Sequence, residues 1–554
     1  MKRQLLLLLC SAALLTACSE ETTDSASMVS VDTSEIEAML HEHIAVLASD
    51  EFEGRAPATP GEELTINYLR NQFQALGIGP GNGDSYYQSV SVTEITTASD
   101  AVLHMKGSNY EASFTYGDEA MVGSQQQIPA IGIFDSELVF VGYGIVAPER
   151  GWNDYAGIDV VAKTVVILVN DPGYATQDPE LFNGNSMTYY GRWTYKYEEA
   201  ARQGAAAALI VHETGPAGYG WEVVSGSWSG PQIGLQAHNL NLDKNEIEGW
   251  LTLDSAESLF SGAGLDYQEL KAAASQRGFT AVPMSDIRAT VSIENSVRTS
   301  TSQNVIAKIT GSQRPDETII YTAHWDHLGV NAELPGDNIY NGAADNATGT
   351  AGLLALAKLH SDLEQAPERS IIFLAVTAEE SGLLGSKWYS EHPIYPLATT
   401  VANINMDNLN TFGRMRDVVV VGYNSSELEN YLEEAASAQG RHLEAEPNPE
   451  RGYYYRSDHF NFAKVGVPAL YAESGEDSVE HGREWGAQQA QDYTDNRYHA
   501  PSDEYNPEWD LSGAAEDLLL YFDIANKLSQ ETSFPNWLEG NEFKGIRDAS
   551  RAAR

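Results

Sequence analysis

Histidines and acidic residues stand directly after several short apolar runs in the second half of this sequence. The run ETIIYTA leads into His324, SIIFLAVTA leads into Glu379 and Glu380, and TVANINM leads into Asp407. Runs of this length and composition are typical of buried strands. Since ligands bind beyond the carboxyl ends of the strands in open α/β sheets, we expect these side chains to converge on one edge of a sheet.

Further candidates stand in loops beside these runs. Asp345 precedes an amphipathic helical pattern in NGAADNATGTAGLLALAKLH, and His499 stands beside a proline in DNRYHAPSDEY. Imidazole nitrogen and carboxylate oxygen suit zinc, and no thiolate is needed. The candidate metal ligands are therefore His324, Asp345, Glu380, Asp407 and His499.

The charges of this set favour a pair of metal ions. Two Zn²⁺ ions carry four positive charges, and the three carboxylates with one bound hydroxide carry four negative charges. In hydrolases that use two metal ions, the ions lie about 3.5–4 Å apart, so a bridging carboxylate and a bridging hydroxide must offset their repulsion. An aspartate in the middle, with a histidine and an acidic residue on each ion, satisfies this requirement.

Glu379 and Asp326 are expected to support the ions without binding them. Adjacent side chains do not easily point the same way, so a metal-binding Glu380 leaves Glu379 to hold the bridging water and accept its proton. Asp326, two residues after His324, is expected to accept a hydrogen bond from the second imidazole nitrogen.

Taken singly, each of these candidate residues has an ordinary explanation, such as a helix N-cap for Asp345. The ordered set, however, points to a metal centre.

Longer motifs contain these residues in a fixed order: AHWDHLG, NGAADNATGTAGLLALA, TAEESGLLGS, NINMDN, RSDHFNFAKVGVPAL and YHAPSDEY. Through them the chain resembles the bacterial co-catalytic double-zinc aminopeptidases that carry an inserted protease-associated domain. The stretches LASDEFEGRAPATPGEE and VVAKTVVILVNDPG are also similar to this group. The resemblance covers about residues 36 to 530.

The resemblance implies how the ligands are shared between the ions. The implied ligands are His324 and Asp407 for one ion, Glu380 and His499 for the other, and Asp345 for both. A cis peptide bond follows the bridging aspartate in this family. The chain has AADNATG where relatives often have ADDNASG, and the bridging position is retained.

Other residues take supporting roles in the family. Glu379 matches the general base, and Asp326 matches the acidic residue behind a ligand histidine. Tyr454, three residues before the triplet SDH, matches a tyrosine that helps to stabilise the tetrahedral oxyanion; alternatively, it packs on the core as part of an aromatic loop. The triplet at 457–459 has the composition of a nucleophilic triad, but adjacent residues do not line up for proton relay, and the family uses this segment structurally.

The expected fold is α/β and zinc-exopeptidase-like, with a mostly parallel mixed sheet flanked by helices. From about residue 290 strands alternate with helices, which is typical of a parallel sheet covered on both faces. By resemblance, a β-rich protease-associated domain interrupts the peptidase domain, lies over the site and limits substrate size. The expected segments are a lipoprotein signal peptide (1–17), a flexible tether (18–35), the first part of the peptidase domain (36–136), the inserted domain (137–288), the catalytic peptidase domain (289–535) and a basic, poorly ordered tail (536–554).

The first residues, MKRQLLLLLCSAALLTACSE, have the basic tip, apolar run and small residues of an export signal. The end of this stretch resembles the lipobox of bacterial lipoproteins, in which the signal is cleaved before a cysteine that then carries the lipid. Cys18 fits this position and would have no disulfide partner, because Cys10 leaves with the signal. We expect a lipid anchor on Cys18 and, from Ser19, a place on the outer membrane facing the periplasm or the cell exterior. The alternative is an ordinary secretory signal.

The formal net charge is −46, from 79 acidic and 33 basic residues. This balance argues against nucleic acid and anionic membrane surfaces as partners. It fits a solvated acidic surface or, alternatively, attraction of cationic substrates.

The sequence thus predicts a zinc-dependent aminopeptidase that acts on peptides with a free N-terminus and removes their N-terminal residues through a metal-bridging hydroxide. Alternatives on the same scaffold are a glutaminyl-cyclase-like enzyme, which uses one zinc ion, and a carboxypeptidase-like enzyme. A further alternative is a non-catalytic, receptor-like binding protein, although every ligand and base position is filled.

Overall fold

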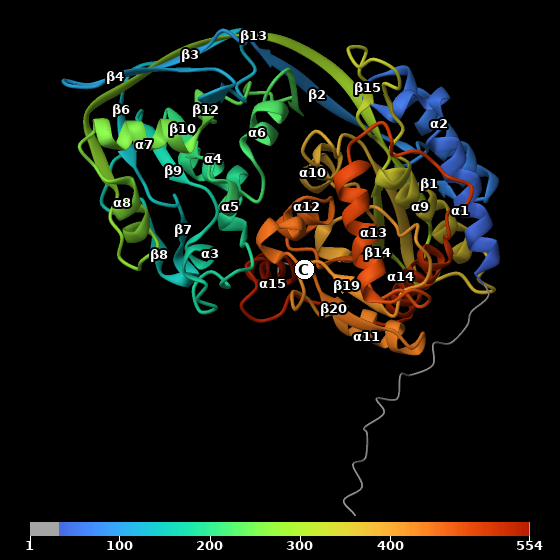
Figure 1. Ribbon diagram of the computed structural model, residues 1–554. Coiled ribbons are helices and arrows are strands. Elements are labelled where there is room, and N and C mark those ends of the chain that lie inside the picture. The colour runs from blue at the N-terminus through green and yellow to red at the C-terminus, as the bar shows by residue number, and fades with distance from the viewer. Residues whose placement is uncertain (1–32, 553–554) are drawn as a thin grey trace, which may run out of the picture.

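The computed structural model describes residues 33–552, with Ser285 described by its backbone alone. The predicted signal peptide, the predicted lipid attachment residue Cys18 and the predicted tether up to residue 32 lie outside the described residues. Figure 1 shows two lobes, and strand β13 (Val282–Ile309) runs from one lobe into the other. Among the described helices, none combines the length and the apolar character that a bilayer crossing requires.

The peptidase lobe is built on a mixed sheet whose central strands are parallel. β14 lies between β17 and β18 and is parallel to both, and β21 follows β18 in the same direction. β13 is the antiparallel neighbour of β17 and, earlier in its course, of β2. The predicted α/β class with a mostly parallel sheet is therefore confirmed. The strands are β1 (Gly79–Pro80), β2 (Tyr87–Thr97), β11 (Pro231–Leu235), β14 (Arg314–His324), β17 (Arg369–Val376), β18 (Thr400–Asn405), β19 (Asp417–Val420), β20 (His442–Ala445) and β21 (Ala469–Ser474).

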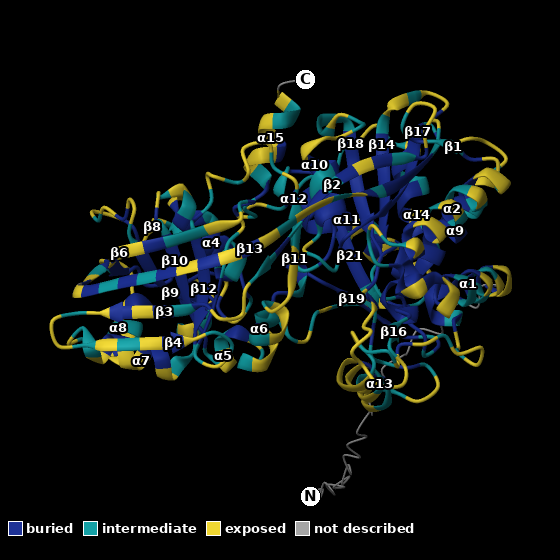
Figure 2. Ribbon diagram, turned by 90° about the horizontal axis from the view of Figure 1, so that it is seen from above, coloured by how far each residue is buried: buried dark blue, intermediate teal, exposed yellow. Residues whose placement is uncertain are grey.

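Helices cover both faces of this sheet because each strand contributes to two cores. Ile319 and Tyr321 of β14 belong to one core, and Ile320 between them belongs to the other, as expected for a pleated strand. Figure 2 shows β14, β17 and β18 as a buried centre. The first core includes residues of α1 (Ser34–Leu47), α2 (Pro60–Ala75), α9 (Thr348–Ser361), α11 (Leu428–Ala438) and α14 (Ser512–Gln530). The second core includes residues of α10 (Leu384–Glu391) and α12 (His459–Lys464).

The second lobe contains its own set of paired strands, in which β6, β9, β10 and β12 are parallel. The first part of β13 pairs antiparallel with β3 and β6 and so belongs to this lobe too. Most of the predicted inserted domain, residues 137–288, lies within this lobe, whose first strand begins at Val102, but β11 within that range pairs with β2 of the peptidase lobe. The strands are β3 (Val102–Lys106), β4 (Glu111–Thr115), β5 (Ala120–Gly123), β6 (Ala130–Phe140), β9 (Thr164–Leu168), β10 (Ala207–Val211) and β12 (Ile247–Leu251). The main helices are α4 (Trp193–Arg202), α6 (Trp221–Ser227), α7 (Leu253–Gly262) and α8 (Tyr267–Ala274).

The stretch predicted as a poorly ordered tail packs on the peptidase lobe over its described part. It forms helix α15 (Lys544–Ala552). The indole nitrogen of Trp537, a residue that is 1% exposed, donates a hydrogen bond to the carbonyl of Gly466 at 3.1 Å. The buried Arg547 donates to the carbonyl of Thr400 at 2.9 Å. These long-range contacts, which the local composition does not reveal, hold the segment in place.

Trp537→Ala is expected to lower the apparent free energy of unfolding by about 3–5 kcal/mol, because the lost ring leaves a cavity in a packed core. Ile546→Ala is the matched control in the same segment, since this side chain is 44% exposed. We expect that control to change the free energy by less than about 0.5 kcal/mol. Urea unfolding followed by circular dichroism measures both variants, and equal unfolding midpoints would contradict the packed position of Trp537.

Candidate metal centre

The predicted site residues lie at the carboxyl edge of the central parallel strands. His324 is the last residue of β14, where it pairs with Val376 of β17. Asn405, the last residue of β18, stands two residues before Asp407 and pairs with Thr322 of β14. Parallel pairing thus brings the ends of separate strands to one edge, as the sequence predicts.

Asp345 lies between two histidines. Nε2 of His324 is 3.2 Å from Oδ1 of Asp345 and 3.1 Å from Oδ1 of Asp407. Nε2 of His499 is 3.3 Å from Oδ2 of Asp345 and 3.0 Å from Oε2 of Glu380. Each carboxylate oxygen of Asp345 therefore faces a different histidine, and the structure brings all the predicted metal ligands together in two joined groups.

The chemistry of both groups suits zinc. Each offers a histidine nitrogen and carboxylate oxygens, which are ligands that zinc takes in proteins. The possible ligand atoms of His324, Asp345 and Asp407 all lie within 4.8 Å of one another. His327, Asp345 and Glu380 form a second group within the same limit, so His327 joins the candidate ligands at this end of the site.

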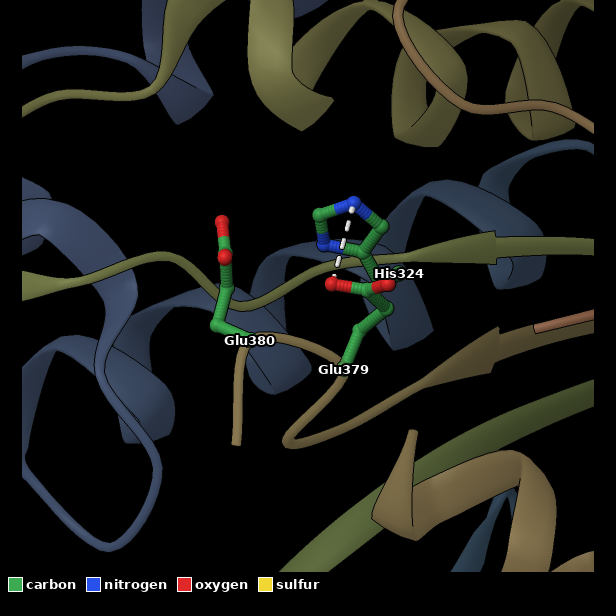
Figure 3. Close-up of side chains that lie close together, drawn as sticks. All are labelled: His324, Glu379 and Glu380. Carbon is green, nitrogen blue, oxygen red and sulfur yellow. Dashed lines mark ion pairs between the residues drawn. The ribbon is translucent and has the colours of Figure 1, made fainter. Parts of the chain in front are cut away.

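Glu379 and Glu380 follow β17 and place their carboxylates differently. In Figure 3 the side chain of Glu379 extends to the ring of His324 with Glu380 beside it, and the possible ligand atoms of the three residues all lie within 4.8 Å of one another. Oε2 of Glu379 lies 4.0 Å from Nε2 of His324. Oε1 of Glu380 lies 2.6 Å from Nδ1 of His327. This geometry fits separate tasks for the two neighbouring acidic residues.

Asp326 supports the site in a different way from the one the sequence predicts. The expected partner of Nδ1 of His324 was the carboxylate of Asp326, but that oxygen is 4.0 Å away, and the backbone carbonyl of Asp326 is closer at 3.1 Å. The carboxylate instead accepts a hydrogen bond from the backbone N–H of Glu379 at 3.1 Å. Asp326 therefore orients a ligand through its main chain and the predicted base through its side chain.

A chain of hydrogen bonds holds Asp407. The hydroxyl of Ser457 donates to Oδ2 of Asp407 at 2.6 Å, and the side-chain amide of Asn405 donates to the Ser457 oxygen at 2.7 Å. The hydroxyl of Thr322 in turn donates to the amide oxygen of Asn405 at 2.6 Å. The triplet at 457–459 thus supplies a positioning residue, and no nucleophile is needed to explain it.

The segment around Asp345 is fixed by side chains that the sequence reasoning did not single out. The peptide bond between Asp345 and Asn346 is cis, as the resemblance implies. The backbone N–H of Asp345 donates to Oδ2 of Asp503 at 3.1 Å. The Asn346 side chain accepts from the N–H of Asn408 at 3.1 Å and donates to the carbonyl of Met406 at 3.0 Å. Asn346 therefore ties the central aspartate to the two residues that flank Asp407.

Arg55 is a further residue that the sequence reasoning missed. This buried side chain donates to the carbonyls of Trp325, Asn341 and Gly342 at 2.9, 2.6 and 2.8 Å. Burial lowers its pKa to about 10, although the charge of Asp503 opposes this shift. Arg55 therefore remains cationic at neutral pH. It joins the loop after His324 to the loop before Asp345.

Tyr454 lies among aromatic rings. Its ring centroid is 4.7 Å from that of His459 and 5.3 Å from that of Tyr455. Its hydroxyl is buried and has no hydrogen-bond partner in the part of the chain that the structure describes. The ring of Tyr498, by contrast, stacks on His499 with centroids 3.9 Å apart and is 49% exposed. The sequence reasoning did not single out Tyr498, although it directly precedes the predicted ligand His499.

The acidic residues set the charge of both histidines. Burial alone lowers the pKa of His324, but the charges of Asp407 and Glu379 outweigh it and raise the pKa well above its ordinary range. Burial also lowers the pKa of His499, and the charge of Glu380 outweighs it, so that the pKa rises to about 10. Protons on these imidazoles offset the carboxylates, and a bound divalent cation would displace them.

Comparison with known proteins finds a match for the part of the chain that contains this site. Residues 304–523 match Peptidase family M28. The matched stretch contains every site residue that the sequence predicts.

Individual relatives are similar over parts of the chain. A segment of 122 residues is 37% identical to aminopeptidase NAALADL1 of Mus musculus and covers 21% of this chain and 15% of that protein. A segment of 210 residues is 29% identical to aminopeptidase YwaD of Bacillus subtilis and covers 37% of this chain and 40% of that protein. The chain thus spans less than half the length of these curated relatives. A solved aminopeptidase from Aneurinibacillus sp. strain AM-1 aligns with a TM-score of 0.49 and 19% identity, over 90% of this chain and 95% of that chain.

The wild-type chain is expected to retain two zinc ions after dialysis, and Asp345→Ala is expected to lose both, because one carboxylate serves the two groups. Asp362→Ala, at the exposed end of α9, is the matched control and should keep the wild-type content. Elemental analysis of the dialysed proteins measures the ratio. Full zinc content in Asp345→Ala would contradict the bridging position.

Ser457→Ala is expected to weaken zinc binding about 10- to 100-fold, because Asp407 loses the hydrogen bond that orients it. Ser390→Ala is the matched control, since this buried hydroxyl donates at 2.8 Å to the carbonyl of Lys387 within α10. Competition with a fluorescent zinc chelator gives both affinities. Identical affinities in the two variants would show that Ser457 does not position Asp407.

Proposed function

We propose that this chain is a zinc-dependent aminopeptidase that removes the N-terminal residue from peptides. The observation that carries the proposal is the shared carboxylate of Asp345, whose oxygens lie 3.2 Å and 3.3 Å from His324 and His499. Hydrolases that use two metal ions place them a few ångströms apart, where one group can serve both. The match of residues 304–523 to Peptidase family M28 supports the proposal, and so do the relatives named aminopeptidases.

The residues that would hold the ions are already fixed by their neighbours. His324 and Asp407 would hold one zinc ion, Glu380 and His499 the other, and Asp345 would contact both. When bound, the ions would polarise the carbonyl of the scissile peptide bond and activate water near neutral pH. The task of the chain is to hold these ligands rigidly and to keep bulk water away from them.

Glu379 is the group that would move the proton. Its carboxylate lies at the rim of the ligand groups, 4.0 Å from Nε2 of His324. Burial raises its pKa well above the ordinary value of a glutamate. A raised pKa makes the carboxylate a stronger base, which can accept the proton of the attacking water and return it to the leaving amine. Asp326 holds the backbone of Glu379 in place for this transfer.

The charge of the site favours a substrate with a free amino terminus. Asp407, Glu379 and Glu380 bring several carboxylates into one small volume, whereas Arg55 directs its hydrogen bonds to backbone carbonyls. With both ions bound, their charges would offset the three ligand carboxylates and a hydroxide, and the carboxylate of Glu379 would remain to attract a positively charged amine, which a neutral acylated terminus lacks. An enzyme that removes the first residue of a peptide needs this preference.

Glu379→Gln is expected to lower kcat for hydrolysis of leucine p-nitroanilide about 10²- to 10⁴-fold, because the amide does not accept the proton of water. Its zinc content is expected to equal that of the wild type. Glu391→Gln, at the exposed end of α10, is the matched control with unchanged rate. Release of p-nitroaniline with and without a chelator provides the measurement. Wild-type activity that persists after the zinc is removed would refute the metal-dependent function.

A further inference from the structure

Arg192 and Arg456 come together where the second lobe packs against the peptidase lobe. The segment before Arg192 contacts the segment before Arg456: the N–H of Met187 donates to the carbonyl of Pro449 at 3.1 Å, and the hydroxyl of Tyr455 donates to the carbonyl of Met187 at 3.2 Å. Figure 1 shows that the two lobes face each other on this side of the molecule. The arginines thus belong to different lobes and share one interface.

Neither guanidinium has an acidic partner. The Nε atoms of both arginines are buried and make no hydrogen bond, and within residues 33–552 neither side chain takes part in an ion pair or a side-chain hydrogen bond. Burial, and next the like charge of Arg456, lower the pKa of Arg192 to about 10. The next largest effects on this pKa come from the hydroxyls of Tyr219, Tyr455 and Tyr189.

This arrangement differs from that of other partly satisfied arginines in the described chain. Arg314, Arg414 and Arg441 each have a buried nitrogen without a hydrogen bond, but each also pairs with a carboxylate. The pairs are Arg314 with Glu368 at 3.0 Å, Arg414 with Glu516 at 2.6 Å, and Arg441 with Asp517 at 2.7 Å. In a chain with 79 acidic and 33 basic residues, two adjacent cations without a carboxylate indicate that an anion comes from outside the chain.

The arginine pair lies next to the candidate metal centre in the chain. Arg456 directly precedes Ser457, whose hydroxyl donates to Asp407 at 2.6 Å. Consecutive Cα atoms lie about 3.8 Å apart, and an extended peptide advances about 3.3–3.6 Å per residue. This adjacency is the basis for placing the carboxylate of a short peptide at the arginines when its first bond is at the ligand groups.

We propose that Arg192 and Arg456 bind a carboxylate of the peptide substrate, so that the enzyme prefers short peptides with a free carboxyl terminus or an acidic side chain. The inference rests on the proposed peptidase function and adds the substrate class. The planar guanidinium fork binds carboxylates through paired hydrogen bonds. An anion between the two arginines also offsets their repulsion, which makes the interface between the lobes part of the substrate site.

The test compares leucyl-alanine with its carboxyl-terminal amide, using the zinc-loaded full-length protein. We expect kcat/KM to be about 10- to 100-fold higher for the free acid than for the amide, since hydrogen bonds to a charged group contribute on this scale. Arg192→Gln and Arg456→Gln are each expected to bring this ratio close to 1, mainly through KM. A second comparison uses leucyl-glutamate amide and leucyl-glutamine amide, which both lack a terminal carboxylate. A higher kcat/KM for the glutamate peptide would show that an acidic side chain is the bound group.

Arg202→Gln is the matched control, because Arg202 ends helix α4, which begins directly after Arg192, and pairs with Glu199 at 2.8 Å. It is expected to keep the wild-type ratio. Calorimetric titration of the Glu379→Gln chain with the same peptides measures binding without turnover. If the titration shows tighter binding of the acid that depends on the arginines, but the wild-type protein hydrolyses neither peptide, only the peptidase function is overturned. No preference for either carboxylate in both assays, or a preference that survives both arginine substitutions, would overturn the inference.

Discussion

Repulsion among buried carboxylates is the interaction on which the rest of this structure depends. Asp345, Asp407 and Glu380 lie within about hydrogen-bond distance of two histidines, with Glu379 beside them. Negative charges placed so close and out of water are stable only when protons or cations offset them. The raised pKa values of both histidines express this need. A site of this kind would favour divalent cations, because bound cations would replace protons that the imidazoles otherwise retain.

The surrounding fold keeps these charges together at a fixed spacing. Parallel pairing of β14 with β17 and β18 sets the strand ends level, and the loops that follow are held by hydrogen bonds to backbone groups. Asn346 connects the Asp345 segment to both neighbours of Asp407, and Arg55 connects the loop after His324 to the loop before Asp345. Carboxylates that repel one another would move apart in a flexible loop. The site therefore requires the hydrogen bonds that hold these loops rigid.

The sequence predicted which side chains lie together at this edge of the sheet because their positions follow from local signals. An apolar run that ends in a histidine or acidic residue marks a strand end, and parallel strands share an edge. Other features depend on contacts between distant segments. The carbonyl of Asp326 replaced its carboxylate because the turn after β14 directs the main chain toward His324. Likewise, Trp537 and Arg547 hold the last described segment through hydrogen bonds to the carbonyls of Gly466 and Thr400, which are distant in the chain. The composition of the tail does not predict these contacts.

The shared strand β13 gives the second lobe a role beyond covering the site. Its first part pairs with β6 and its later part with β2 and β17, so one strand takes part in the sheets of both lobes. The segment that contains Met187 is therefore presented to the peptidase lobe in a fixed position. Binding groups that are held in place before the ligand arrives lose little conformational entropy when it binds. A substrate contacted from both lobes would thus be selected by its length as well as by its amino terminus, because the distance between the ligand groups and the interface is set by the fold.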